Sequence, residues 1–217
     1  MIFTALAAPP PLSSDGSMTH ATVASAKAAL RLAVRNRRKA LVLQHPEADW
    51  MAAELGVAAI DAKFGLGAGK VVALYRAMGS ELDPTPLAEL LAARGWTLAL
   101  PFCEDDHRMT FRRWTVGDSL ARDVAGLPAP EPHAEILQPD LIICPLLAFD
   151  RAGGRLGQGA GWYDRTLVEL KASKEVWVVG LAYSGQEVAR VPAEDHDQRL
   201  DAILTEAGYQ LAEPEQD

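Results

Sequence analysis

The sequence predicts a single three-layer α/β domain, in which a largely parallel sheet carries helices on both faces. Two apolar runs without polar alternation, at residues 139–150 and 175–183, are typical of strands buried on both sides. Segments of helical period alternate with these and with shorter strand-like runs. Such alternation favours a parallel sheet between helical layers. No internal repeat or linker breaks the pattern after residue 20, so residues 21–217 are expected to form one domain.

The first half of this domain is predicted to alternate helices and strands. Leu30 and Val34 fall at helical spacing in a basic and apolar segment, and the alanine-rich pattern that follows ends in glycines. Gly95 stands just past a later pattern that begins with prolines, which is typical of a helix. In chain order, the predictions are a helix over 21–44, a helix over 46–65, a strand over 70–77 and a helix over 84–95.

The second half is predicted to hold most of the sheet. Its apolar and β-branched runs indicate strands over 96–103, 109–115, 139–150, 175–183 and 201–206, and a helix over 162–173. A glycine-rich stretch joins the strand that ends at Asp150 to that helix. In open parallel sheets, ligands bind beyond the carboxyl ends of the strands. The glycine-rich stretch therefore stands where a site is expected.

Charge and cysteine content argue against several classes of protein. The formal net charge of −8 argues against a dedicated nucleic-acid binder, which usually shows a basic face. Cys103 and Cys144 lie outside any CxxC pair, which argues against zinc or a disulfide framework and fits a reducing cytoplasm. The apolar run 2–8 is short and lacks a basic flank, and no later run is long enough to span a membrane. We expect a cytoplasmic protein with a disordered extension over residues 1–20, and with neither nucleic acid nor a membrane as partner.

The stretch GGRLGQGAGWYDR, residues 153–165, is predicted to bind phosphate. Backbone N–H groups converge in a glycine-rich turn before a helix, and the helix N-terminus adds partial positive charge. The stretch matches neither the Walker loop nor GxGxxG, and its glycines alone are equally compatible with a flexible surface loop. Its flanks favour a site. They add two cations for phosphate, a carboxylate for a metal ion and two stacking rings, namely Arg155, Arg165, Asp164, Trp162 and Tyr163.

The extended stretch FDRAGGRLGQGAGWYDR, residues 149–165, resembles the signature of the 5-formyltetrahydrofolate cyclo-ligase family, F-D-x-x-G-x-R-L-G-x-G-x-G-Y-Y-D-R. Three further stretches resemble family segments in the expected order: KAALRLAVRNRR at 27–38, GSELDPTPL at 79–87 and VPAEDHDQRLDAILTE at 191–206. The resemblance covers residues 27–206. The chain departs from the family pattern at Gln158, at Ala160, where many members have glycine, and at Trp162, which replaces the first tyrosine.

The resemblance implies a fold like that of NagB, RpiA and CoA transferases, and a ligase that consumes ATP. Its reaction converts 5-formyltetrahydrofolate to 5,10-methenyltetrahydrofolate and releases ADP and phosphate. The formyl oxygen is phosphorylated, and N10 then attacks the activated carbon. The implied cofactors are ATP and Mg²⁺, the folate is the small-molecule partner, and we expect a monomer. Two alternatives stay open: a related ATP-using enzyme that acts on another formamide, and a non-catalytic nucleotide-binding protein.

The resemblance also implies roles for single residues. Lys27 and Arg31 lie four residues apart on one helical face and would bind ATP phosphates, whereas the residues alone are more typical of a solvated basic face. Whether Arg35 and Arg38 join them stays open. The full set implied for ATP is Lys27, Arg31, Arg155, Leu156, Gly157, Gln158, Gly159, Ala160, Gly161, Trp162 and Tyr163, of which Arg155, Gly159 and Tyr163 are the expected catalytic residues.

The residues implied for the folate and the metal ion differ in part from those implied for ATP. Glu81 is expected to accept hydrogen bonds from the pterin ring, although an acid there would also suit the first turn of the next helix. The implied substrate residues are Arg76, Glu81, Gln158, Gly159, Ala160, Gly161 and Trp162. Asp164 and Asp197 are expected to hold Mg²⁺, since that ion usually takes one or two carboxylates. Glu194 and Asp195 are expected to be solvated, and His196 is not expected to act as a base.

Overall fold

A computed structural model describes residues 20–213 of the chain. The expected disordered extension lies outside the described residues, apart from His20, at which helix α1 (His20–Gln44) begins. Within the described part, no helix is both long and apolar enough to cross a membrane.

The core of the fold is one mixed sheet whose strand order is β12-β11-β10-β7-β1-β2-β3-β6. Its central strands β11, β10, β7, β1 and β2 run parallel, and β12, β3 and β6 add antiparallel edges. In chain order the strands are β1 (Val71–Ala73), β2 (Thr97–Cys103), β3 (Met109–Arg113), β6 (Ile136–Leu137), β7 (Leu141–Pro145), β10 (Trp177–Leu181), β11 (Ala202–Thr205) and β12 (Gly208–Leu211). The largely parallel α/β sheet expected from the sequence is confirmed.

Two short hairpins stand apart from the large sheet. One pairs β4 (Ala121–Arg122) with β5 (Pro128–Ala129), and the other pairs β8 (Ala148–Phe149) with β9 (Arg155–Leu156). The second hairpin begins the glycine-rich stretch, which is therefore partly a strand and not only a loop.

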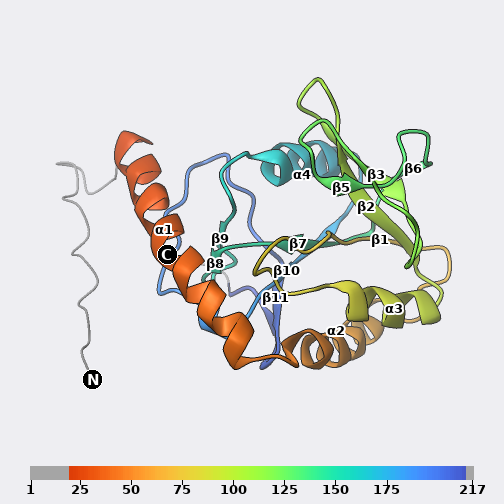
Figure 1. Cartoon of the computed structure of the whole chain (residues 1–217), viewed down its shortest axis with the longest axis horizontal. Coiled ribbons are helices and arrows are strands. Elements are labelled where there is room, and N and C mark those ends of the chain that lie inside the picture. Colours follow the sequence, from red (N-terminus) through yellow and green to blue (C-terminus); the bar gives the residue numbers. More distant parts are fainter. Residues whose placement is uncertain (1–19, 214–217) are drawn as a thin grey trace.

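Helices cover both faces of the sheet, as Figure 1 shows, with α2 (Ala48–Phe64) and α3 (Thr85–Ala93) on one face and α4 (Trp162–Ser173) on the other. Strand β7 shows why its sequence is apolar throughout. Leu141 and Ile143 pack into the cluster beneath α2 and α3, whereas Ile142 and Cys144 pack into the cluster with α4. A strand covered on both faces needs apolar residues at every position. Helix α1 packs Val34 against the β8–β9 hairpin.

Two strand predictions were too long. The run 139–150 was expected as one strand, but β7 ends at Pro145 and the chain continues into the β8–β9 hairpin. The physical reason is that the carbonyl of Leu146 accepts hydrogen bonds from two side chains instead of from a neighbouring strand. The run 70–77 forms a strand only over Val71–Ala73. Because the large sheet takes strands from β1 to β12, we propose that the described chain is one domain.

Candidate active site

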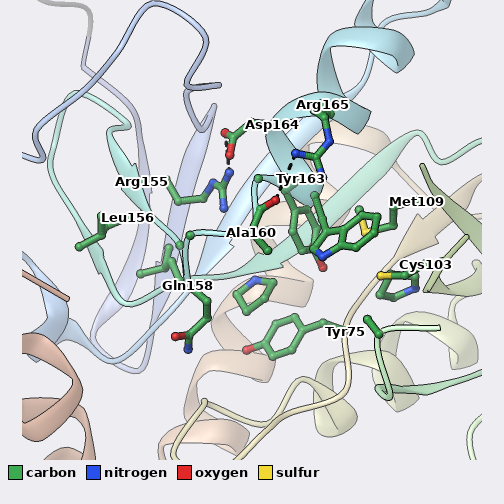
Figure 2. A pocket seen from close by; sticks show the side chains of 18 of the residues that line it. Tyr75, Cys103, Met109, Arg155, Leu156, Gln158, Ala160, Tyr163, Asp164 and Arg165 are labelled. Atoms are coloured by element: carbon green, nitrogen blue, oxygen red, sulfur yellow. Dashed lines mark hydrogen bonds and ion pairs between the residues drawn. The ribbon is translucent and has the colours of Figure 1, made fainter. Parts of the chain in front are cut away.

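A cavity of about 980 Å³ opens beyond the carboxyl ends of β1, β2 and β7. Segments from the whole chain line it, from α1 to the 194–197 turn. All the residues implied above for ATP, folate and Mg²⁺ are among its lining residues. Figure 2 shows Arg155, Leu156 and Gln158 on one side of the pocket and Cys103 and Met109 on the other. The sequence-predicted site residues are therefore brought together, and the structure adds residues that the sequence did not indicate.

A buried carboxylate holds the base of the glycine-rich stretch. Asp150 is only 5% exposed, and its oxygens accept hydrogen bonds from the backbone N–H of Gly154 at 2.8 Å and of Val191 at 2.7 Å. The side chain thus ties the β8–β9 turn to the segment that leads to residues 194–197. A carboxylate that accepts backbone N–H groups makes a charge-assisted hydrogen bond, which is shorter and stronger than a neutral one.

Beyond β9 the glycine-rich stretch lies against α1. The Arg31 guanidinium donates from Nε to the carbonyl of Gly157 at 3.0 Å, and Arg35 donates to the Gln158 side chain at 2.8 Å. Gly159 has φ +106°, a conformation that costs a residue with a side chain far more than glycine. A Cβ at Gly159 would also stand 3.2 Å from the Arg31 guanidinium carbon. The conformation therefore favours glycine at this position, and a side chain there would also require the Arg31 guanidinium to shift.

The carboxylate that ends the stretch is paired with a buried cation. Asp164 accepts a hydrogen bond from Arg155 Nη2 at 2.7 Å and one from the backbone N–H of Gln198 at 3.1 Å. The Arg155 side chain is 4% exposed, so this ion pair is largely removed from water. Asp164 consequently joins the start of α4 to the segment after Asp197.

A second cluster of charges joins α1 to the 194–197 turn. Lys27 Nζ lies 2.5 Å from Asp197 Oδ2 and 2.7 Å from Glu194 Oε2. Burial lowers the pKa of Lys27, but the hydrogen bonds to Asp197 and Glu194 outweigh it, so that the pKa lies above the ordinary 10.5. Glu194 was expected to be solvated, and this was wrong: its side chain is 15% exposed and bound to Lys27. The turn folds back on itself, because Asp197 accepts from the Glu194 N–H at 2.7 Å.

This turn also gathers the groups best placed for a cation. Among the described residues, Glu194, His196 and Asp197 each offer a ligand atom, and these atoms lie within 4.8 Å of one another. Asp164 is not part of this group and faces Arg155 instead. Carboxylate oxygens are the ligands that Mg²⁺ prefers, so Asp197 fits such an ion, and the carboxylate beside it is Glu194.

The other end of the cavity is apolar and was not predicted. The ends of β2 and β3 and the β4–β5 hairpin contribute Pro101, Cys103, Met109, Leu127 and Pro128. No motif marks these residues; the only signal is that β2 was predicted to end near Cys103. Burial, with Asp123 nearby, raises the pKa of Cys103 to about 12, so the thiol is protonated at neutral pH and packs as an apolar group.

Two aromatic residues stand between these ends. The Arg165 guanidinium carbon lies 5.2 Å from the centre of the Trp162 ring, and the Arg155 guanidinium carbon lies 5.6 Å from that of Tyr163. The Tyr163 hydroxyl is buried and has no hydrogen-bond partner among residues 20–213. Burial raises its pKa well above 10, so it stays a donor at neutral pH. An unpartnered buried hydroxyl in a cavity wall is a candidate for a bond to a ligand.

Comparison with known proteins assigns the chain to a family. A model of the 5-formyltetrahydrofolate cyclo-ligase family matches residues 23–206. The chain belongs to this family. A 5-formyltetrahydrofolate cyclo-ligase of Mycolicibacterium smegmatis is 33% identical over 146 residues, which cover 63% of this chain and 74% of the relative. The namesake from Haemophilus influenzae is 33% identical over 141 residues, or 62% of this chain and 75% of the relative.

Solved structures agree with this assignment. The 5,10-methenyltetrahydrofolate synthetase of Aquifex aeolicus superposes with a TM-score of 0.68 at 29% identity, over 88% of this chain and 95% of that one. The synthetase of Mycoplasma pneumoniae gives a TM-score of 0.66 at 25% identity, over 83% of this chain and 98% of that one. The cyclo-ligase resemblance seen in four separated motifs is thereby confirmed.

Proposed function

We propose that this protein is a 5-formyltetrahydrofolate cyclo-ligase, which uses ATP to close 5-formyltetrahydrofolate to 5,10-methenyltetrahydrofolate. One observation carries the proposal: four family motifs, far apart in the sequence, supply the wall of a single cavity beyond the sheet. Such a cavity suits a ligand with both charged and planar parts, because one of its ends is ionic and the other apolar.

The ionic end is the proposed site for the ATP phosphates. Arg31 and Arg155 supply fixed cations, and the backbone from Gly157 to Gly161 runs beside them into the N-terminus of α4. Phosphoryl transfer depends on positioning and on neutralising charge that spreads over the phosphoryl oxygens. Cations held by buried partners provide that neutralisation without reorganising during the reaction.

Lys27, Glu194 and Asp197 fit a role with Mg²⁺ and phosphate together. The two carboxylates would hold the ion, with Asp164 nearby at the start of α4, and Lys27 would contact phosphate. When bound, Mg²⁺ neutralises charge on the phosphate oxygens. We also propose a monomeric enzyme, as the resemblance implies, and the two buried free cysteines support a cytoplasmic location.

The folate is proposed to lie between Glu81 and the apolar end. The Glu81 carboxylate would accept from pterin N–H groups, with Arg76 and Tyr163 as further polar contacts, and Trp162 would offer a stacking face. The formyl oxygen is a weak nucleophile, so it must be held in line with the γ-phosphate. Transfer of the γ-phosphoryl group to that oxygen would release ADP and activate the formyl carbon. N10 would then attack this carbon and lose its proton, and phosphate would leave with the former formyl oxygen as the methenyl bridge closes.

An absorbance assay tests this function directly. The purified protein, given 5-formyltetrahydrofolate, Mg²⁺ and ATP, should form the methenyl product, and omission of either ATP or Mg²⁺ should stop it. Phosphate release separates the alternatives: it requires the folate for a cyclo-ligase, another formamide for a related enzyme, and is absent for a nucleotide-binding protein. No methenyl product under any of these conditions would refute the proposal.

A further inference from the structure

Arg38 of the α1 motif turns away from the glycine-rich stretch, whereas Arg31 and Arg35 donate hydrogen bonds to it. Arg38 is 5% exposed, and it is absent from the lining of the cavity, whereas Lys27 and Arg31 are part of it. Its guanidinium reaches the opposite wall, where Nη1 lies 3.5 Å from Glu81 Oε1 and Nε donates to Ser80 Oγ at 3.1 Å. We propose that Arg38 is a positioning residue that holds the Glu81 carboxylate in the orientation needed for the folate and pairs with its charge.

The guanidinium is itself held in place by the sheet. Arg38 Nη1 donates to the carbonyl of Leu146 at 3.2 Å, and Gln186 Nε2 donates to the same carbonyl at 3.0 Å. Gln186 is 1% exposed, and Leu146 follows directly after β7. Leu146 follows the end of a central strand, so its carbonyl has a fixed position. Arg38 therefore holds the segment that carries Glu81 in a fixed position relative to the sheet.

Glu81 is restrained from its other side as well. Its Oε2 accepts from the backbone N–H of Met78 at 3.0 Å, and the Tyr75 hydroxyl donates to the carbonyl of Leu82 at 2.5 Å. The Glu81 side chain is 10% exposed, so a charged carboxylate there needs a nearby cation. Arg38 meets that need without entering the cavity. A glutamate fixed in one rotamer also avoids the entropy cost of ordering when the ligand binds.

This inference rests on the proposed function, because it concerns the residue proposed to contact the pterin ring. It differs from a phosphate role for Arg38, which the family motif alone would equally allow. A phosphate-binding arginine would change the affinity for nucleotide, whereas a positioning residue for Glu81 changes the affinity for folate. The two roles are therefore separable by measuring each ligand alone.

The test compares Arg38→Met and Arg38→Lys with Arg37→Met, a matched change at the exposed neighbouring position. Binding of 5-formyltetrahydrofolate without ATP is measured by quenching of tryptophan fluorescence, and binding of a non-hydrolysable ATP analogue by calorimetry. Arg38→Met should weaken folate binding about tenfold, which is typical for loss of one charged hydrogen bond. Arg38→Lys should recover part of that loss. Arg37→Met should change neither affinity, and the ATP analogue should bind all variants within about twofold of wild type.

A double-mutant cycle with Glu81→Gln separates positioning from general damage. If Arg38 acts through the carboxylate, Arg38→Met should have little further effect on folate binding in the Glu81→Gln protein. Ser80→Ala, which removes one acceptor and keeps both charges, gives a milder second variant should Arg38→Met fold poorly. It should weaken folate binding about twofold to threefold.

The results of these binding measurements test the proposed function and the positioning role of Arg38 separately. Wild-type protein that binds no 5-formyltetrahydrofolate would overturn the proposed function. Wild-type protein that binds it, with Arg38→Met and Glu81→Gln effects that simply add, would overturn the positioning role alone. Ser80→Ala and Arg38→Lys proteins with wild-type folate affinity would do the same.

Discussion

The ionic and the apolar ends of the cavity are built in different ways. At the ionic end, charged groups are bound to partners on other segments, and two of these partners lie far away in the sequence: Lys27 meets Asp197, and Arg31 meets the Gly157 carbonyl. At the apolar end, neighbouring segments of the β2–β3 region supply groups such as Pro101, Cys103 and Met109, which contribute surface rather than paired charge.

This difference has an energetic consequence. Removal of one charged group at the ionic end leaves its buried partner uncompensated, so a single substitution affects both stability and ligand binding. Removal of an apolar group costs contact area in proportion to the atoms lost. The ionic end should therefore respond sharply to single changes and the apolar end gradually.

The largest loss of folding free energy is expected when the buried ion pair between Arg155 and Asp164 is broken. Asp164→Asn keeps an oxygen near Arg155 but removes the charge, so it should cost about 3 kcal/mol of folding free energy. The melting temperature should fall by several degrees, and kcat/KM at limiting Mg²⁺ should fall as well. Asp195→Asn, at an exposed position of the 194–197 turn, is the control and should be close to wild type in both measurements. An Asp164→Asn protein with wild-type melting and turnover would show that this pair contributes nothing.

Substitutions in the glycine-rich stretch should lower activity more than stability. Gly159→Val places a branched side chain at φ +106° and against the Arg31 guanidinium. We expect a loss of ~2–3 kcal/mol of transition-state stabilisation in kcat/KM, comparable to loss of one oxyanion donor. The positive φ should lower the melting temperature by a few degrees, but the protein should stay folded, because the position is exposed and outside the core.

Ala160→Gly gives an internal control in the same stretch. Ala160 has no positive φ, and the family commonly has glycine there, so the change should be mild. An active Gly159→Val enzyme would mean that the glycines serve only as a connector, and the proposed phosphate site would have to lie elsewhere.

Substitution of Lys27 should change the affinities for the metal ion and for ATP in opposite directions. Lys27→Met frees Glu194 and Asp197 from their cation, so Mn²⁺, measured by paramagnetic resonance without nucleotide, should bind severalfold more tightly. The same change should raise the KM for ATP about tenfold, through loss of a charged contact to phosphate. Arg113→Met, which breaks an exposed ion pair with Glu135, is the control. If both affinities fell together, general damage to the turn would explain the result.

The smallest loss of ligand affinity is expected for a residue that contributes contact surface and no charge. Trp162→Leu should weaken folate binding by ~0.5–1.5 kcal/mol, the typical contribution of an aromatic pair, and leave ATP binding unchanged. Trp162→Tyr restores the family residue and should be close to wild type. A Trp162→Leu effect larger than that of Gly159→Val would show that the stacking surface matters more for the site than the glycine-rich backbone.

The sequence by itself determined the family, the α/β class and the position of the glycine-rich stretch between a buried strand and a helix. These features follow from local periodicity and from motifs, which are readable along the chain. It also predicted that Lys27, Glu81, Asp164 and Asp197 belong to one site, although only the resemblance linked them.

The tertiary structure alone decided which of these groups touch. It placed Glu194 beside Lys27, paired Asp164 with the buried Arg155, and turned Arg38 toward Glu81 instead of toward the glycine-rich stretch. It also ended β7 at Pro145, where side chains take over the carbonyl of Leu146. The physical reason is that a charge pair across 170 residues depends on how helices and strands pack, and that packing leaves no mark in the local sequence.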